Sequence, residues 1–257
     1  MYAENIKGRT AFVSGASAGI GEAVAKMLAS NGVNLILAAR RIEKLDKLKS
    51  GLEEKYSVKV KTIKLDFSKS EDIKKAIENL EDKKIDILIN NAGLALEKDL
   101  YYKNSIEDSI QMLRVNCEGL IVLTRILLPY ILESKHGHIV NLSSTAADEV
   151  YSGGAVYCAT KSFVEIFGNS LRVELIDKPI KITNIKPGAV NTEFSTVRFK
   201  GDKEKADNVY KGFSPLYAED IADNIEYALT RKSHVQISSM TIMAENQGSA
   251  TIIYKKQ

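Results

Sequence analysis

The 257-residue chain is poor in cysteine, proline, histidine and tryptophan, of which it has two, four, three and none. Its cysteines, Cys117 and Cys158, form no CxxC pair, which disfavours both a disulfide framework and a cysteine-based zinc site. The histidines stand in no HExxH spacing, so no metal site is expected. The low proline content, with only 16 glycines, excludes the collagen-like and proline-rich classes.

Charge of one sign and long apolar runs are scarce as well. The 36 basic residues exceed the 33 acidic ones by +3 and are dispersed along the chain, so we expect no nucleic-acid partner. The N-terminal residues carry no apolar signal core. The most apolar stretch, residues 120–132, is interrupted by Arg125 and Pro129 and is too short to cross a bilayer. We therefore expect a cytoplasmic protein that has no membrane partner.

Short apolar runs alternate with longer amphipathic ones, which is the pattern of βαβ units around a parallel sheet. This predicts an α/β fold, a single doubly wound Rossmann-type domain over residues 1–257 with about seven parallel strands and helices on both faces. The expected strands are 10–14, 33–39, 58–65, 85–90, 138–143, 180–186 and 235–243, and the expected helices are 20–30, 41–56, 70–80, 106–133, 155–176 and 218–230. Residues 188–215 lack a strong pattern, and because long loops in compact domains are usually functional or mobile, we interpret them as a substrate lid.

A glycine-rich turn follows the first expected strand and leads into the first expected helix. Such a turn lets the backbone approach a pyrophosphate, and the helix N-terminus supplies free N–H groups and about half a positive charge. The glycine spacing alone also fits a tight turn without a ligand, but the strand–turn–helix context favours a dinucleotide site. The expected cofactor contacts in this turn are Gly15, Ser17, Ala18, Gly19, Ile20 and Gly21.

The end of the second expected strand indicates which dinucleotide is bound. In NAD-binding folds an acidic residue about 20 positions after the glycines bonds the ribose 2′-hydroxyl. Here that position holds Ala39, and Arg40 and Arg41 follow it. Guanidinium groups match phosphate oxygens, which favours NADP(H) over NAD(H). The alternative is that both arginines are simply solvated at the start of a helix.

Tyr157 and Lys161 stand four residues apart on one face of the expected helix 155–176. They open this helix at the sheet edge where open α/β folds bind ligands, and Ser144 precedes them at the end of a strand. Hydride transfer to a ketone leaves an alkoxide that needs a proton. Tyrosine has a reference pKa of about 10, which a nearby ammonium lowers. We therefore expect Lys161 to lower the pKa of Tyr157, and Ser144 to donate to the substrate oxygen.

Together these residues resemble the short-chain dehydrogenase/reductase family, and the resemblance covers nearly the whole chain. It implies that Asn116 holds a water that links Lys161 to solvent, so that the catalytic residues are Asn116, Ser144, Tyr157 and Lys161. It also implies that the cofactor contacts Tyr157, Lys161, Asp66, Asn91, Ala92, Gly93, Pro187, Gly188, Val190 and Thr192. From the residues alone, Asn116 could instead satisfy backbone groups at a helix bend, and Asp66 could cap the next turn.

A narrower resemblance links residues 38–45 and 192–202 to the NADP-dependent 3-hydroxy acid dehydrogenases, which oxidise L-serine and L-allo-threonine at the 3-hydroxyl. It implies a small 3-hydroxy acid as the substrate, held by Ser144 and Tyr157. Arg198 would then pair with the carboxylate, unless it binds a neighbouring loop or subunit instead. The alternatives are a broad-range ketone or aldehyde reductase, a 3-oxoacyl thioester reductase and a non-catalytic NADP sensor.

The expected helices 106–133 and 155–176 carry apolar residues on more than one face. A helix that is apolar all round needs a second partner, either inside the monomer or on another chain. In the family that this sequence resembles, these two helices pair across a two-fold axis, usually in tetramers. A homotetramer is therefore expected. The apolar residues of these two helices include Ile110, Leu113, Leu120, Phe163, Phe167 and Leu171.

Overall fold

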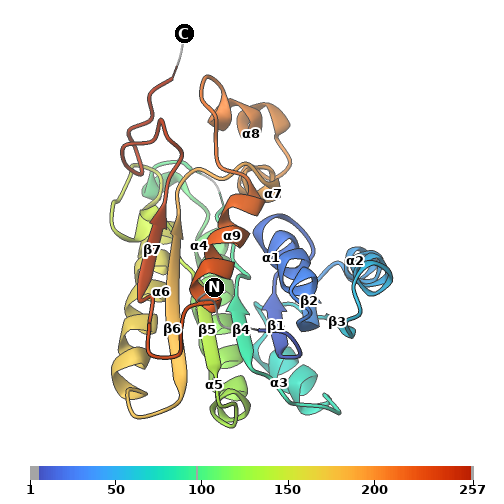
Figure 1. Ribbon diagram of the computed structural model, residues 1–257. Helices are drawn as coiled ribbons and strands as arrows, with labels where there is room; N and C mark the ends of the chain where they lie inside the picture. The colour runs from blue at the N-terminus through green and yellow to red at the C-terminus, as the bar shows by residue number, and fades with distance from the viewer. Residues whose placement is uncertain (1–5, 97, 256–257) are drawn as a thin grey trace.

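The computed structural model describes residues 6–96 and 98–255. Within this part of the chain, seven strands form one parallel sheet in the order β3-β2-β1-β4-β5-β6-β7, which confirms the expected doubly wound α/β fold (Figure 1). Three parts of the expected domain lie outside the described residues, namely 1–5, 97 and 256–257. The strands are β1 (Thr10–Ser14), β2 (Asn34–Ala39), β3 (Val60–Lys64), β4 (Ile87–Asn90), β5 (Gly137–Leu142), β6 (Ile180–Pro187) and β7 (Ser239–Ile242).

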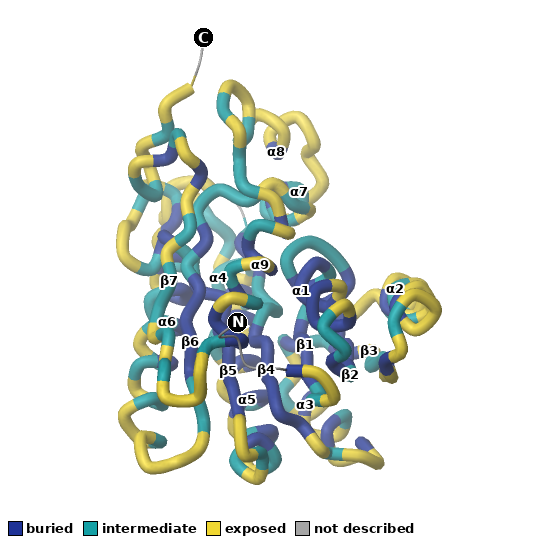
Figure 2. Tube along the Cα trace, in the orientation of Figure 1, coloured by how far each residue is buried: buried dark blue, intermediate teal, exposed yellow. Residues whose placement is uncertain are grey.

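Helices cover both faces of the sheet because neighbouring strand residues point to opposite sides. In β1, Ala11 and Val13 join the apolar cluster under α1, α2 and α9, whereas Phe12 joins the cluster under α3, α5 and α6. Buried residues run through the strands, while α2 and α8 are mostly exposed (Figure 2). The longer helices are α1 (Gly19–Ser30), α2 (Ile42–Lys55), α3 (Ser70–Glu78), α4 (Ile106–Leu113), α5 (Gly119–Leu132), α6 (Ala155–Glu174) and α9 (Ala218–Leu229).

The expected helix 106–133 is interrupted by a short π-helical segment, η2 (Arg114–Glu118), in which the N–H of Gly119 bonds the carbonyl of Arg114. The run Ile106–Leu132, of which the apolar stretch 120–132 is the second half, has 27 residues and by length and composition alone could cross a membrane. Its side chains Leu123, Leu127 and Ile131 are buried against the sheet. The core helix of a globular protein passes the same length and composition test.

The segment 188–215, which has no strong sequence pattern, contains two short helices, α7 (Glu193–Arg198) and α8 (Lys203–Tyr210). Each begins with a side-chain cap: Thr192 Oγ1 accepts the N–H of Phe194 at 3.3 Å, and Asp202 accepts the N–H of Lys205 at 3.1 Å. Both helices lie beyond one end of the sheet, at the top of the view in Figure 1. Two further single turns are η1 (Tyr101–Lys103) and η3 (Thr145–Ala147).

The order of the strands determines where ligands have access. The chain leaves β1 toward β2 on one side and later returns to β4 on the other, so the carboxyl ends of β1 and β4 lie side by side. In open α/β sheets this reversal leaves a crevice outside the carboxyl ends of the strands.

Candidate active site

A cavity of about 880 Å³ opens at this end of the sheet. It brings together most of the residues that the sequence analysis singled out. From the glycine turn it includes Gly15, Ser17, Ala18, Gly19 and Ile20, and from the connections after the strands it includes Arg40, Arg41, Asp66, Asn91, Ala92, Gly93, Ser144, Pro187, Gly188, Val190 and Thr192. Tyr157, Lys161 and Arg198 also line it, whereas Gly21 and Asn116 do not.

The glycine turn is shaped for close backbone approach. Gly15 and Gly19 have φ values of +68° and +57°, which residues with a Cβ rarely adopt. Ala18, which precedes α1, supplies no side-chain cap, so within the described residues the first N–H groups of this helix face the cavity without one. These features fit the pyrophosphate of a dinucleotide.

Gly21 lies behind the residues that line the cavity. A Cβ at this position would lie 2.5 Å from Asn91 Nδ2 and would also collide with the Gly15 carbonyl. The side chain of Asn91 itself donates to the carbonyls of Ser14 and Gly15 at 2.9 and 3.1 Å. Gly21 thus lets α1 pack closely against the two turns that shape the site, although it does not itself line the cavity.

Ser14 joins the turn after β1 to the segment after β4. Its hydroxyl donates to the Ile89 carbonyl at 3.1 Å and accepts the N–H groups of Asn91 and Ala92 at 3.0 and 2.9 Å. One buried hydroxyl therefore positions two walls of the cavity.

The two arginines have different surroundings. Arg41 donates from Nε and Nη2 to Ser17 Oγ at 3.2 and 3.1 Å, and from Nη1 to Glu193 at 2.7 Å. Lys44 bonds the other oxygen of Glu193 at 2.7 Å. Arg40 is exposed and its charge acts on Asp66. The sequence analysis missed Glu193, because nothing in the pattern pairs two residues 152 positions apart.

Asp66 lines the cavity and also caps the turn that follows it. It accepts the N–H and the hydroxyl of Ser68 at 3.0 and 2.8 Å. Burial raises the pKa of its carboxyl, but the hydrogen bonds from Ser68 and the charge of Arg40 lower it further, so that the net pKa lies below the usual value. Asp66 is therefore ionised at neutral pH.

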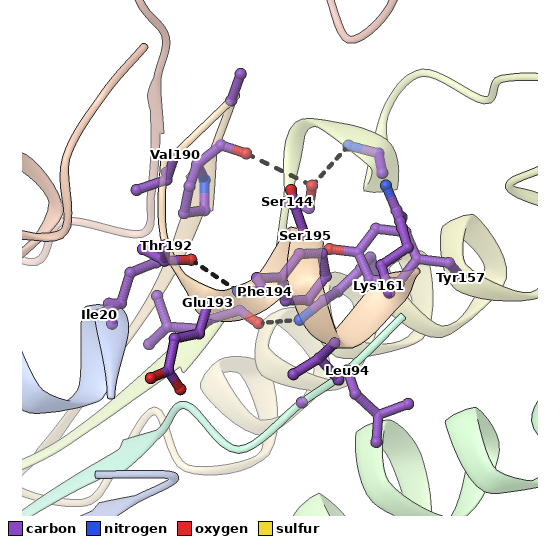
Figure 3. Close-up of a pocket in the computed structure, with 18 of the residues that line it drawn as sticks. Ile20, Leu94, Ser144, Tyr157, Lys161, Val190, Thr192, Glu193, Phe194 and Ser195 are labelled. Carbon is purple, nitrogen blue, oxygen red and sulfur yellow. Dashed lines mark hydrogen bonds between the residues drawn. The ribbon is translucent and has the colours of Figure 1, made fainter. Parts of the chain in front are cut away.

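Tyr157 and Lys161 lie on the first turns of α6. Lys161 is 6% exposed and donates from Nζ to the Leu142 carbonyl at 2.7 Å, as Figure 3 shows. Burial lowers the pKa of Lys161 to about 8. Burial raises the pKa of Tyr157 to about 12, and the opposing influences are the charge of Arg198 and the hydroxyl of Ser144.

The expectation that Lys161 lowers the pKa of Tyr157 was therefore wrong for this structure. The lysine Nζ lies 5.8 Å from the tyrosine ring centroid and is engaged with a backbone carbonyl, whereas the Arg198 guanidinium lies 4.9 Å from the same ring. Loss of contact with water dominates the titration of both residues.

Asn116 stands in the π-helical segment η2 and is buried. Its side chain accepts the N–H of Leu94 at 2.9 Å and donates to the Leu94 carbonyl at 2.8 Å and to Thr160 Oγ1 at 3.0 Å. This is the backbone-satisfying role that the sequence left open. The same amide ties the segment after β4 to α6 at Thr160, the residue before Lys161. A Cβ on Gly93 would touch both Asn116 and Lys161, at 3.4 and 3.5 Å.

Arg198, at the end of α7, borders the same chamber as Tyr157. It donates to the Tyr151 hydroxyl at 2.7 Å, and its guanidinium also lies 5.4 Å from the Phe194 ring centroid. Within the described residues its Nε is buried and has no hydrogen-bond partner. Lys98 lines the cavity too, and its pKa is lowered by burial and by the charge of Arg198. The sequence analysis missed Lys98 and Tyr151, which stand in no recognisable motif, and it gave no role to Phe194 within the segment 192–202.

Gly21→Ala tests the glycine packing. We expect a loss of about 1–3 kcal/mol in the free energy of unfolding, because the added methyl has no space between two backbone turns. Gly51→Ala is the matched control, because a Cβ there meets nothing within 4 Å and α2 is helical. It should gain about 0.5–1 kcal/mol. Urea unfolding measures both, and a neutral Gly21→Ala would contradict the packing argument.

Comparison with protein families and known structures identifies this constellation. Residues 9–203 match the family model described as short chain dehydrogenase. The NADP-dependent 3-hydroxy acid dehydrogenase of Schizosaccharomyces pombe is 46% identical over 255 residues, covering 98% of both chains. Serine 3-dehydrogenase of Rhizobium radiobacter is 38% identical over 243 residues, covering 94% of this chain and 96% of the relative.

Solved structures agree with the sequence comparison. A closed form of serine dehydrogenase complexed with NADP⁺ superimposes with a TM-score of 0.88 at 38% identity, covering 96% of this chain and all of that one. Serine dehydrogenase from Escherichia coli superimposes with a TM-score of 0.79 at 34% identity, covering 93% and 99%. The likeness extends over the sheet and both helical layers.

Proposed function

Because the chain belongs to the short-chain dehydrogenase family, we propose that it transfers a hydride between NADP(H) and a small 3-hydroxy acid, of which L-serine and L-allo-threonine are examples. The chain is an oxidoreductase of this family. The observation that carries the proposal is one cavity that joins a glycine turn, a pair of arginines and the Tyr157–Lys161 helix.

NADP(H) fits the first half of this cavity. The backbone around Gly15 and Gly19 leaves room for the pyrophosphate, and Ala39 places no carboxylate against a 2′-phosphate. The Schizosaccharomyces pombe relative and the closed serine dehydrogenase structure reported above both name NADP, which supports the same cofactor here. When bound, NADP(H) gives or takes the hydride. The chain's own residues that hold it are those of the glycine turn, Arg40, Arg41, Asp66, Asn91, Ala92, Gly93, Tyr157, Lys161, Pro187, Gly188, Val190 and Thr192.

The proton is moved by the residues on α6 and after β5. In the reductive direction the Tyr157 hydroxyl donates its proton to the oxygen that becomes the alcohol, and a pKa of about 12 keeps that phenol protonated at neutral pH. Ser144 holds the substrate oxygen by a hydrogen bond. The charge of Arg198, which lowers the pKa of Tyr157 against the effect of burial, stabilises the phenolate left behind, and Lys161, with a pKa of about 8, stays largely protonated at neutral pH on the same helix as Tyr157. Asn116 positions the segment beside Lys161, and a water there returns the proton from solvent.

The far end of the cavity favours an acid. Arg198, Lys98 and Lys255 line it, and the charges of Arg198 and Lys255 lower the pKa of Lys98. Cations held close together without a carboxylate between them are stabilised by a bound anion. The Arg198 guanidinium lies 4.9 Å from the Tyr157 ring centroid, so a small acid whose carboxylate binds Arg198 would lie beside Tyr157. This supports a 3-hydroxy acid over a neutral ketone.

Tyr157→Phe separates an enzyme from a nucleotide sensor. Removal of the hydroxyl should lower kcat by about 10²–10⁴-fold, because the alkoxide loses its proton donor. Binding of NADPH, measured by its fluorescence, should persist. Tyr102→Phe, at a 76% exposed ring, is the control and should leave both unchanged. Unaltered turnover in Tyr157→Phe would contradict the catalytic assignment.

Arg198→Met and Lys98→Met test the carboxylate site. We expect KM for 3-hydroxybutyrate to rise about 10-fold or more in each, while KM for 2-butanol stays within a factor of two, because only the acid loses an ionic partner. Lys103→Met, at an exposed position, controls for the lost charge. An equal rise in KM for both substrates would exclude the carboxylate role.

We also propose that the chain forms a homotetramer and works in the cytoplasm on small molecules, without a nucleic-acid or membrane partner. Exposed apolar side chains on α4 and α6 support the assembly, since Ile106, Ile166 and Val173 are 75%, 63% and 75% exposed. Light scattering should report particles of about four chain masses. Particles of one chain mass only, 28.4 kDa, would exclude the oligomer.

A further inference from the structure

The arginine proposed to bind the cofactor's 2′-phosphate already has an anionic partner within the chain. Glu193, the first residue of α7, places one carboxylate oxygen 2.7 Å from Arg41 Nη1 and the other 2.7 Å from Lys44 Nζ. Arg41 is further fixed by two hydrogen bonds to Ser17 Oγ. Both Ser17 and Glu193 line the cavity, so this ion pair stands in the wall of the nucleotide site.

The carboxylate is charged and its contacts can be exchanged. Hydrogen bonds from Lys44 and Arg41 hold the pKa of Glu193 below its usual range, so it is ionised at neutral pH. About half of the side-chain surface of Glu193, and of each of its two partners, is exposed. Exposed ion pairs are weak, and a dianion that reaches the same cations competes well against a single carboxylate.

Carboxylate and phosphate groups bind a guanidinium group with the same hydrogen-bond geometry. Each accepts two parallel N–H donors, and Arg41 already uses Nη1 for Glu193 and both Nε and Nη2 for Ser17. A phosphate dianion placed beside the Glu193 carboxylate is also repelled by it. One anion at a time therefore fits the Arg41–Lys44 pair.

We propose that Glu193 is a specificity-determining residue, an internal counter-ion that occupies Arg41 and Lys44 until the 2′-phosphate of NADP(H) displaces it. The inference rests on the proposed use of NADP(H). It means that the preference between the two dinucleotides is set by the arginines together with an acid that opposes them. The acid lowers the affinity for the phosphate and keeps the cations neutralised when that phosphate is absent.

The test measures the affinity of two nucleotides that differ only in the 2′-phosphate, adenosine 2′,5′-bisphosphate and 5′-AMP, by isothermal titration calorimetry on the full chain. Glu193→Gln keeps the side-chain length and removes the charge. We expect it to bind the bisphosphate about 3–10-fold more tightly and 5′-AMP within a factor of two, and the gain should shrink at high salt. Unchanged or weaker binding of the bisphosphate would overturn the proposal, since a carboxylate that only orients Arg41 would help the phosphate.

Glu71→Gln is the matched control, because Glu71 is another exposed glutamate paired with a lysine, at 2.6 Å from Lys74 on α3. It should change neither affinity. Arg41→Ala, alone and with Glu193→Gln, separates this inference from the cofactor proposal. If Arg41→Ala removes the preference for the bisphosphate while Glu193→Gln has no effect, only the role of Glu193 fails. If Arg41→Ala leaves the preference intact, the phosphate site itself is wrong and the inference falls with it.

Discussion

A single buried hydroxyl holds the two chain segments on which the cavity depends. Ser14 ends β1, and its oxygen accepts N–H groups from the segment after β4 while donating back to the end of that strand. The backbone ladder between β1 and β4 ends at the pair Val13–Ile89. Beyond the end of this ladder, the hydrogen bonds of Ser14 and of the Asn91 amide hold the two segments together. The glycine turn owes its shape to this junction, because Gly21 packs against the same atoms.

Burial determines the electrostatics on the other side of the cavity. The pKa of Tyr157 rises to about 12 and that of Lys161 falls to about 8, and in both the loss of water is the largest cause. For Lys161 the folded pKa lies below the unfolded value, so the cost of burying the ammonium is fully present below pH 8. That cost is relieved as the pH rises toward the unfolded pKa. Holding the charged Lys161 at the site of the proposed chemistry therefore lowers the stability of the fold at neutral pH.

The features that the sequence predicted are those carried by short-range patterns. Alternation in β1 and its neighbours, the glycines at 15, 19 and 21, and the four-residue spacing of Tyr157 and Lys161 all have a local physical cause. The helices α7 and α8 were not predicted, because segments of six and eight residues are too short to show a clear helical periodicity of apolar residues. The π-helical segment around Asn116 was not predicted, because its shifted hydrogen bonds do not change the pattern of apolar residues in the sequence.

Contacts between distant residues were out of reach for the same reason. The Arg41–Glu193 pair and the approach of Lys98 to Arg198 each join residues that only the tertiary fold brings together. The pKa of Tyr157 shows the limit most clearly. The spacing to Lys161 correctly predicted proximity, but proximity did not decide the titration, because desolvation is a property of everything packed around the phenol.

The two ends of the cavity carry different charges, and α7 contributes a charged residue to each end. Among the described residues that line it, the carboxylates are Asp66 and Glu193, and both face arginines at the nucleotide end. The substrate end holds Arg198 and Lys98 without a carboxylate in the lining. Glu193 and Arg198 are the first and last residues of one six-residue helix, and Figure 3 shows Phe194 between Glu193 and Tyr157. An anion that takes Arg41 from Glu193 therefore removes a contact of the helix that presents Arg198, so the proposed cofactor and substrate contacts share one short helix.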